Sequence, residues 1–223
     1  MDLTVRDAAK LLATSEKNVY RWIHEGTLPC CRVSDRYRLN RVELLEWASR
    51  RQMTVSPEIF QDEQQEIGKL LLTEAMKRGG MIYDLPGEDK KSVLPAICAA
   101  MPVPKSVNRE ELHSVLLARE QLASTAIGNG IAIPHPRSPI VVGVTQPLVT
   151  LAFLKKPVDF GALDGRLVHT LFVTLSTTIR LHLQILSHLM FVLQSLEFRK
   201  LLSQRAGAEV LLKEIENIEG RIK

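Results

Sequence analysis

The stretch STAIGNGIAIPHPR, residues 124–137, decides how the larger part of this chain is interpreted. Two glycines separated by one residue precede an Ile-Ala-Ile run suited to a buried strand, and a histidine follows between two prolines. Each proline fixes its own φ and pushes the residue before it towards extended geometry. The imidazole of His135 is therefore predicted to be held at a strand end with little backbone freedom.

His135 is open to several interpretations from its residue type alone: a general base, a metal ligand, a phosphoryl acceptor, or a packed residue at the end of a strand. For an arbitrary histidine the packed residue would be favoured. Here Gly128 and Gly130 allow close backbone approach, and Arg119 and Arg137 supply positive charge suited to an anionic group. This neighbourhood favours chemistry on an anion.

Two segments together point to a known family. Leu117-Ala118-Arg119-Glu120, followed by the 124–137 stretch, resembles the active-site segment of the enzyme IIA domains of the fructose, mannitol and nitrogen-regulatory branch of the bacterial phosphotransferase system. PVDFGALDG at 157–165 resembles the turn of that family, and HLQILS at 182–187 resembles the helix that carries its second histidine. The resemblance spans most of residues 66–223.

The resemblance implies a phosphocarrier in which His135 accepts a phosphoryl group from the protein HPr or a paralogue and passes it to a cysteine of a IIB domain. It also implies that His182 and Arg119 occupy the positions that support the transfer. The transition state spreads charge over equatorial oxygens, so such support consists of positioning, cations and hydrogen-bond donors. Thr125 and Asn129 could add hydrogen bonds, but turn and cap roles explain them equally well.

No cofactor is expected. Neither GxGxxG nor GxxxxGK[ST] occurs, and Gly128-Asn129-Gly130 is too short for a nucleotide loop, so neither ATP nor NAD is implied. The spacings among His135, His169 and His182 match no short metal motif, and no metal is expected. The three cysteines, two of them adjacent, form neither a disulfide framework nor a zinc pairing and are expected to be reduced thiols. The histidines without an assigned role are expected to be structural or at the surface: His113, His169 and His188.

Length and composition bound the remaining possibilities. The 223 residues leave room for one medium domain and a small one, with the 45% hydrophobic content of a globular protein. No apolar run approaches the roughly 20 residues that span a bilayer and no signal-peptide core is present, so a cytoplasmic protein without membrane contact is expected. The net charge of +4 alone says little about nucleic acid. Residues 1–55, however, hold ten Lys and Arg against seven Asp and Glu.

The first 55 residues predict a helix-turn-helix with a wing. Thr4 is placed to cap a first helix and Ser15 a second, which Gly26 would end. Two short helices joined by a tight turn outline that motif. Residues 31–39 suit a two-stranded hairpin, and Asn40 is placed to cap a third helix.

Residues 3–51 resemble the winged helix-turn-helix of the MerR and excisionase families through the LTVRDAAKLLATSEKNVYRWIHEGTLP opening, an arginine-containing wing and the VELLEW close. The resemblance implies that the second helix enters the major groove of DNA and that the wing touches the flanking backbone. The alternative is a solvated surface on a module kept for protein contacts. One module contacts few base pairs, so specificity would call for a homodimer on paired half-sites. The residues expected to contact DNA are Lys17, Asn18, Tyr20, Arg21, Arg36, Tyr37 and Arg38.

The predicted organisation is a DNA-binding domain at 1–55, a linker at 56–65 and a IIA domain at 66–223. A helix is expected from about Asp62 to Gly79-Gly80, directly before a strand. The alternation of helices and strands that follows favours an α/β fold, a three-layer sandwich in which helices flank a IIA-type mixed sheet.

Taken together, the sequence predicts a phosphoryl-accepting regulatory protein of the phosphotransferase system, acting as a transcriptional or nitrogen/carbon regulator. Phosphorylation of His135 would add about two negative charges and change DNA affinity or dimerisation. One alternative is a IIA component of a sugar transport system whose N-terminal module serves protein contacts. Another is a scaffold that retains the fold and is never phosphorylated.

Overall fold

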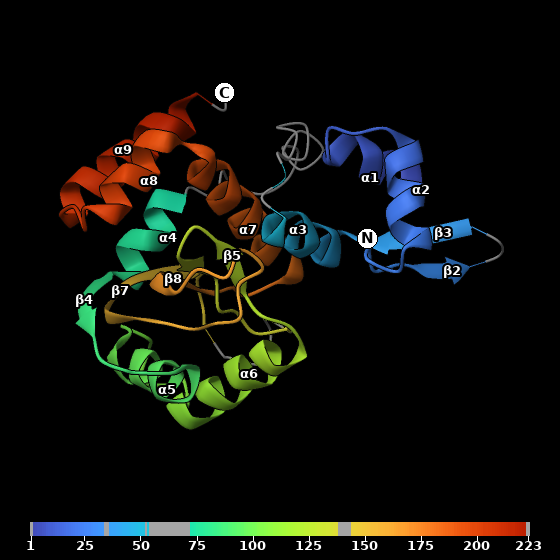
Figure 1. The fold of residues 1–223 in the computed structure, drawn as a ribbon. Coiled ribbons are helices and arrows are strands. Elements are labelled where there is room, and N and C mark those ends of the chain that lie inside the picture. The colour runs from blue at the N-terminus through green and yellow to red at the C-terminus, as the bar shows by residue number, and fades with distance from the viewer. Residues whose placement is uncertain (1, 34–35, 52, 54–71, 138–143, 222–223) are drawn as a thin grey trace. The chain divides into compact units, whose positions relative to one another are not determined.

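The chain folds into two compact units, Met1–Gly68 and Lys69–Lys223, which are described separately (Figure 1). The computed structural model describes residues 2–33, 36–51, 53, 72–137 and 144–221. The predicted linker at 56–65 and the start of the predicted helix at Asp62 lie outside these residues. The domain boundaries drawn from the sequence therefore stay predictions.

The N-terminal unit is the predicted helix-turn-helix with a hairpin. Thr4 and Ser15 cap the first two helices as expected, each accepting a hydrogen bond from the third residue after it. A two-residue strand at the start of the chain was not predicted; it completes an antiparallel sheet of order β1-β3-β2. The elements are β1 Asp2–Leu3, α1 Val5–Leu11, α2 Glu16–His24, β2 Cys31–Val33, β3 Arg36–Asn40 and α3 Arg41–Arg50.

A small aromatic core holds this unit together. The rings of Trp22 on α2 and Trp47 on α3 lie 4.9 Å apart, and the Arg51 guanidinium lies 4.6 Å from the centre of the Trp47 ring. Aromatic pairs of this kind add about 0.5–1.5 kcal/mol beyond the area they bury. Ala8, Val19 and the leucines of α3 are fully or almost fully buried beside them. The apolar faces of the three helices thus meet in one core.

After Gly80 the C-terminal unit alternates helices and strands, as the sequence predicted, and it contains one short strand that was not expected. The strand β5, only three residues long, was missed. The elements are α4 Leu72–Gly79, β4 Met81–Leu85, α5 Lys90–Ala100, α6 Arg109–Leu122, β5 Ala126–Gly128, β6 Ile131–Ala132, β7 Leu148–Val158, β8 Val168–Leu175, α7 Ile179–Gln194, α8 Leu196–Ser203 and α9 Ala208–Gly220.

These strands form one mixed sheet of order β4-β7-β8-β6-β5. β4 runs parallel to β7 and β6 parallel to β8, whereas the β7–β8 and β5–β6 pairs are antiparallel. Every residue from Leu148 to Leu154 is buried, as expected for a strand covered on both faces. The mixed sheet confirms the predicted fold class.

Helices cover both faces of the sheet, which makes three layers (Figure 1). Phe172 of β8 belongs to a core with α4, α7, α8 and α9, whereas its neighbours Leu171 and Val173 belong to a second core with α5 and α6. Successive side chains of a strand point to opposite faces, so this alternation places one core on each side of the sheet. The short strand β6 lies inside the sheet, between β8 and β5.

Glu219, near the end of α9, ties the last helix to the first helix of this unit. Its carboxylate accepts hydrogen bonds from the backbone N–H of Leu72 at 2.5 Å and from the Thr73 hydroxyl at 2.6 Å, at the start of α4. His188 of α7 lies 3.6 Å from the same carboxylate. Burial by itself raises the pKa of Glu219, but the hydrogen bonds from His188, Thr73 and the backbone outweigh it and hold the pKa below its ordinary value.

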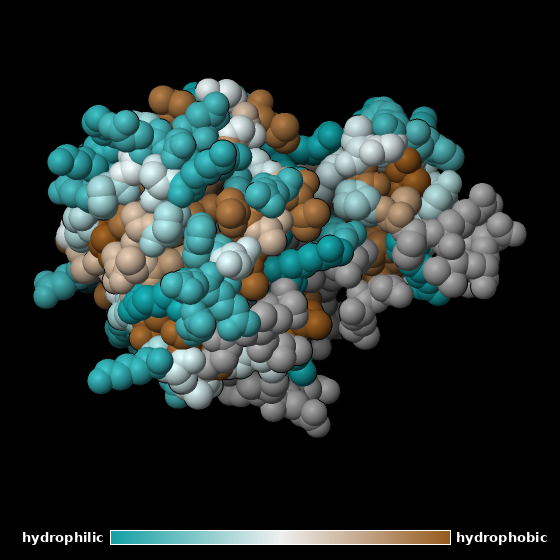
Figure 2. Space-filling model, turned by 90° about the horizontal axis from the view of Figure 1, so that it is seen from below, coloured by the Kyte–Doolittle hydropathy of each residue, from teal (hydrophilic) through white to brown (hydrophobic). Residues whose placement is uncertain are grey.

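The surface of this unit mixes hydrophilic and apolar side chains on the face shown in Figure 2. The large apolar side chains that are exposed come from several elements, among them Leu122 on α6, Leu163 before β8 and Leu196 on α8. Single exposed leucines of this kind are ordinary for a folded protein. Among the described residues, no helix combines the length and apolarity that crossing a membrane requires.

Candidate functional site

An Asn-Gly turn connects β5 to β6. Asn129 and Gly130 have φ values of +53° and +74°, the left-handed conformation that such a two-residue hairpin turn requires. The backbone N–H of Asn129 donates to Asp164 Oδ2 at 2.8 Å, which ties the turn to the loop before β8. The structure therefore gives Asn129 a turn role, one of the two interpretations that its sequence position left open.

The other end of this hairpin delivers His135. Ile133 N donates to Thr125 O at 3.0 Å, and Thr174 N of β8 donates to Pro134 O at 3.1 Å. These hydrogen bonds extend the strand backbone on both sides beyond the two residues of β6. His135 therefore leaves the sheet beside the C-terminal end of β8, as the flanking prolines predicted.

The His135 ring is held in one orientation by the backbone. Its Nδ1 lies 2.7 Å from Ile133 O, and a carbonyl oxygen can only accept a hydrogen bond. Nδ1 must therefore carry the hydrogen, and in the neutral ring the lone pair in the ring plane belongs to Nε2. Only 3% of the residue's surface is exposed. The ring is thus less open than its expected docking role suggested, and Nε2 is its nucleophilic atom.

His182 provides a second imidazole beside the first. The two ring centroids are 5.1 Å apart with the planes inclined at 45°, and His182 Nδ1 lies 3.4 Å from Ser176 Oγ. His182 belongs to the first turn of α7, whose N-cap is Thr178. The positive end of the helix dipole therefore lies on the His182 side of the ring pair, where added negative charge is favoured. The two histidines predicted to act together are brought together.

Arg119 lies in the last turn of α6, a few residues before the β5–β6 hairpin begins. It is 5% exposed, and its Nη1 donates to Ala123 O at 2.8 Å, just before the strand β5 begins. This hydrogen bond satisfies a carbonyl at the helix end, so Arg119 has a structural role there. Its contribution to a phosphoryl site stays a prediction.

The predicted DNA-contact residues of α2 divide into exposed and engaged groups. Lys17, Tyr20 and Arg21 are exposed. Asn18 is half-buried, and its Nδ2 donates to Thr14 Oγ1 at 2.9 Å, which turns the amide towards the start of its own helix. The exposed face of α2 therefore offers two cations and a phenol.

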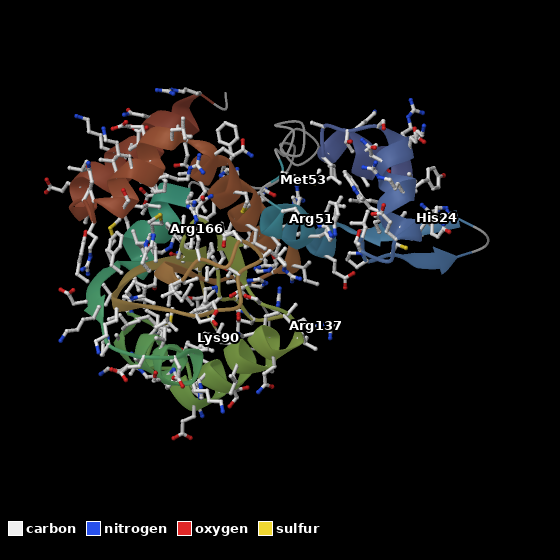
Figure 3. The ribbon with its side chains drawn as sticks, in the orientation of Figure 1. His24, Arg51, Met53, Lys90, Arg137 and Arg166 are labelled. Atoms are coloured by element: carbon white, nitrogen blue, oxygen red, sulfur yellow. The ribbon has the colours of Figure 1, made fainter. Side chains whose placement is uncertain are left out.

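Tyr37 on β3 joins the hairpin to α2. Its ring lies 6.1 Å from the Tyr20 ring and 6.3 Å from the His24 ring, edge to face in both cases. Figure 3 shows His24 at the end of α2 next to the hairpin. Arg38 is half-buried on the same strand, and the Arg36 side chain lies outside the described residues. The hairpin and the proposed recognition helix are thus held together by aromatic contacts.

Comparison with known families now assigns both units. Residues 76–218 match the family described as "Phosphoenolpyruvate-dependent sugar phosphotransferase system, EIIA 2", and residues 3–52 match a helix-turn-helix domain. The first match covers more than half of the chain. The chain belongs to the EIIA 2 family. We refer to its two parts as the IIA domain and the helix-turn-helix domain.

Several relatives place the IIA domain near the nitrogen-regulatory type. A nitrogen regulatory protein of Pseudomonas aeruginosa is 34% identical over 152 residues, which are 66% of this chain and 96% of that protein. The crystal structure of the nitrogen regulatory protein IIA-Ntr from Neisseria meningitidis has 27% identity and a TM-score of 0.57, over 66% of this chain and 99% of that one. A fructose-specific EIIABC component of Bacillus subtilis is 28% identical; the matched region is 63% of this chain but only 22% of that protein.

Glu120 accepts hydrogen bonds from Thr125, the residue directly before the β5–β6 hairpin of the IIA domain. Sequence reasoning assigned Glu120 no role. Its Oε2 accepts hydrogen bonds from Thr125 N at 3.0 Å and Thr125 Oγ1 at 2.6 Å. Lys90 Nζ lies 3.4 Å from Glu120 Oε1 and donates to Phe160 O at 3.2 Å. The Thr125 hydroxyl is therefore occupied inside the protein. An acidic residue at the C-terminal end of a helix, where it opposes the helix dipole, was the signal for such a role.

Arg180 is a second residue of the IIA domain that sequence reasoning missed. It lies in the first turn of α7, two residues before His182, in a turn that contains no acidic residue. Basic residues are disfavoured at helix N-termini unless an anion is nearby, so this position was a usable signal. Arg137, by contrast, is exposed two residues after His135 (Figure 3).

The remaining histidines and cysteines of the IIA domain show no metal site. Among the described residues no group of three or more His, Cys, Asp or Glu side chains could hold a metal ion. His113 and His188 are half-buried on helices, and burial lowers the pKa of the half-buried His169. Cys98 is a buried thiol whose pKa burial raises to about 12, which makes it a poor nucleophile.

Proposed function

We propose that the chain is a phosphoryl-accepting regulator, in which His135 takes a phosphoryl group from HPr or a paralogous phosphocarrier and the helix-turn-helix domain binds DNA. The observation that carries the proposal is the Nδ1–Ile133 hydrogen bond of 2.7 Å, next to a second imidazole at 5.1 Å. A histidine serving only as a core residue would need neither a fixed tautomer nor a second imidazole beside it.

The transfer step follows from that hydrogen bond. The Nε2 lone pair of His135 attacks the phosphorus of the donor phosphohistidine, the donor P–N bond breaks, and its electron pair returns to the donor ring. The His135 ring gains positive charge as the new P–N bond forms. Because Nδ1 keeps its hydrogen, the Ile133 carbonyl stabilises this charge through the existing hydrogen bond.

The surroundings of the ring suit the charge that develops on the phosphoryl oxygens. His182 can donate a hydrogen bond, and the N-terminal turn of α7 adds the positive end of a helix dipole. Arg119 is proposed as a cationic support. Because only 3% of the residue's surface is exposed, we expect side chains next to His135 to move when a donor docks.

The regulatory half of the proposal concerns DNA. Lys17 and Arg21 are placed to contact phosphates or base edges from α2, with the hairpin held beside them through Tyr37. Phosphorylation of His135 adds about two negative charges to the IIA domain. Similarity to nitrogen regulatory proteins supports a regulatory rather than a transport role, with DNA affinity or self-association as the controlled quantity.

Labelling with reconstituted donors tests the phosphocarrier half. The full chain is incubated with phosphoenolpyruvate, enzyme I and HPr. Wild type and the control His113→Gln should be labelled, and His135→Ala should not. His182→Ala should be labelled about 10²-fold more slowly than wild type, because removing a single hydrogen-bond donor to a transition state has an effect of this size. Equal labelling of His135→Ala and wild type would remove the proposal.

Binding to a DNA duplex at several salt concentrations tests the other half. Arg21→Gln should lower affinity and reduce the slope of log K against log salt by about one, as expected for one lost phosphate contact. Lys10→Gln removes an exposed charge from α1 and should leave the slope unchanged. Identical slopes for both variants would count against DNA contact through α2.

A second candidate function is a IIA component of a sugar transport system. The similarity to a fructose-specific EIIABC component favours it, although the chain spans only 22% of that protein. In this case phosphorylated His135 would pass its phosphoryl group to a cysteine of a IIB domain. Transfer from the labelled chain to a purified fructose-type IIB domain, with no DNA binding, would support this function over regulation.

A further inference from the structure

The IIA domain has a cavity of about 250 Å³ at the opposite end of β6 from the phosphoryl site. His169 and Asn129 line it from the sheet side, and Arg199 and Leu202 line it from α8. At the cavity, His169 N donates a hydrogen bond to Gly130 O at 2.8 Å. His135 lies five residues after Gly130 in the sequence. At about 3.3 Å of rise per residue the two sites are about 16 Å apart. The cavity is therefore separate from the phosphoryl site.

Arg199 brings an unpaired cation to this cavity. Its Nε is buried and has no hydrogen-bond partner, and no carboxylate in the described part of the chain forms an ion pair with it. Other arginines of the domain are paired, such as Arg205 with Asp84 at 2.8 Å. A buried donor of a charged group left without a partner is destabilising. Arg199 lines the cavity, so an anion bound there would lie beside its positive charge.

His169 supplies a second hydrogen-bonding group. Its Nδ1 lies 2.8 Å from the hydroxyl of the fully buried Thr170. A hydroxyl can donate or accept, so this contact fits either neutral tautomer. In the tautomer in which the hydroxyl donates to Nδ1, Nε2 carries the hydrogen and can donate to a ligand. The ring packs so closely over Gly130 that a Cβ on that residue would lie 2.3 Å from Nε2. The imidazole is therefore fixed in position beside the cavity.

The rest of the lining suits a carbon skeleton more than a bare ion. Ile131, Leu196 and Leu202 form its apolar part, and Leu196 is 77% exposed at the rim. Sites for small molecules combine apolar walls with a few convergent polar groups in this way. The Ser203 hydroxyl already donates to Lys200 O at 2.8 Å, so it can accept a hydrogen bond from a ligand.

We propose that this cavity binds a small organic anion, with its carboxylate or phosphate group on Arg199 and His169 and its carbon skeleton against Leu196 and Leu202. The site would be an effector site of the IIA domain. It does not depend on the phosphoryl transfer proposed for His135, and its occupation can be measured in the chain without any donor protein.

Titration calorimetry and ¹⁵N NMR on the full chain test this proposal, with succinate, glycerol 3-phosphate and inorganic phosphate as probes. At least one organic probe should bind with a dissociation constant below about 1 mM and shift the backbone amides of Gly130 and His169. Inorganic phosphate should bind more weakly, because it lacks the carbon skeleton. The stronger of the two organic probes identifies the head group that the site prefers.

Two variants and a control separate a built site from surface charge. Arg199→Gln should weaken binding at least about tenfold, as expected for losing a hydrogen bond to a charged group. Leu196→Glu places a negative charge at the exposed rim and should weaken it similarly, with little risk to folding. Lys200→Gln removes an exposed charge from the same helix outside the cavity and should change affinity less than twofold.

The proposal is overturned if no organic probe binds the wild-type chain at 20 mM, a concentration of about twenty times the expected dissociation constant. It is also overturned if Leu196→Glu and Lys200→Gln have the same effect, or if the amide shifts centre on His135 instead of Gly130. Should Arg199→Gln prove unfolded, the Leu196→Glu comparison decides alone.

Discussion

Glu120→Ala is expected to destabilise the IIA domain by about 3 kcal/mol, because each of the two Thr125 donors that it leaves unpaired costs about 1–3 kcal/mol. Losing one partner of a buried ion pair costs about 3–5 kcal/mol. The side chain of Lys90 is 35% exposed and can rehydrate, which favours the lower end of that range. For a domain of this size the change corresponds to about 6–12 °C in melting temperature.

Far-UV circular dichroism during urea or thermal unfolding measures this loss. Both tryptophans lie in the first 55 residues, so tryptophan fluorescence follows the helix-turn-helix domain separately and should not change. Gln121→Ala is the control, because that side chain is exposed on the same helix turn. Glu120→Gln keeps an oxygen that can accept from Thr125 and should lose only about 1 kcal/mol.

The same variant tests whether the hairpin positions His135. Under conditions in which Glu120→Ala stays folded, its labelling by the phosphocarrier should be slower than that of Gln121→Ala. Equal stabilities of the two alanine variants, within about 0.5 kcal/mol, would refute the reasoning, since that is the range of an ordinary surface substitution.

Three further predictions concern other parts of the chain. Gly130→Ala should destabilise the IIA domain by about 2–4 kcal/mol in urea unfolding, because it forces φ = +74° on a side chain and places its Cβ 2.3 Å from His169 Nε2. Lowering the pH from 6 should reduce the free energy of unfolding of the IIA domain, because the pKa of Glu219 is lower in the folded than in the unfolded chain. The stability that ionised Glu219 contributes is complete above the unfolded pKa of about 4.3 and is lost as the pH falls through the folded pKa. Glu219→Gln should flatten that part of the stability–pH curve. Tyr37→Ala should destabilise the helix-turn-helix domain by about 1–3 kcal/mol, measured by tryptophan fluorescence, because two aromatic contacts are lost.

Each of these three has a matched control. Gly207→Ala adds a Cβ where nothing lies within 4 Å and where φ is −63°, so it should leave stability nearly unchanged. Glu216→Gln removes an exposed carboxylate from the same helix as Glu219 and should leave the curve below pH 6 close to wild type. Lys17→Ala changes the exposed face of α2 without touching the aromatic contacts. Agreement between variant and control in any pair would contradict the corresponding prediction.

Local signals in the sequence predicted most elements of the fold. Thr4 and Ser15 cap the helices that they were expected to cap, because a side-chain oxygen before a helix satisfies its first N–H groups wherever the helix lies. The strands β1 and β5 were missed, with two and three residues each. Strands this short show no alternation of apolar and polar residues, and they form only because the sheet offers them a partner.

The candidate site was predictable only in part, because its contacts join distant residues. The family resemblance predicted that His135 and His182 act together. In the structure the chain passes from β8 into α7, which places His182 beside His135. No spacing in the sequence shows that these two residues are neighbours. The burial of His135 likewise depends on packing within the folded domain, which no local pattern in the sequence shows. The Asn-Gly turn, by contrast, depends on only two adjacent residues, Asn129 and Gly130, whose types favour the left-handed backbone conformation that the turn requires.

The nitrogen that carries the phosphoryl group tests the central claim most directly. Nδ1 of His135 donates to the Ile133 carbonyl, so the phosphoryl group should bond to Nε2, which gives the 3-phosphohistidine isomer. After phosphorylation of the full chain by HPr, the ³¹P spectrum should show this isomer. A proteolytic digest should recover it in the peptide that contains residue 135. A 1-phosphohistidine isomer, or label recovered in any other histidine peptide, would contradict the account.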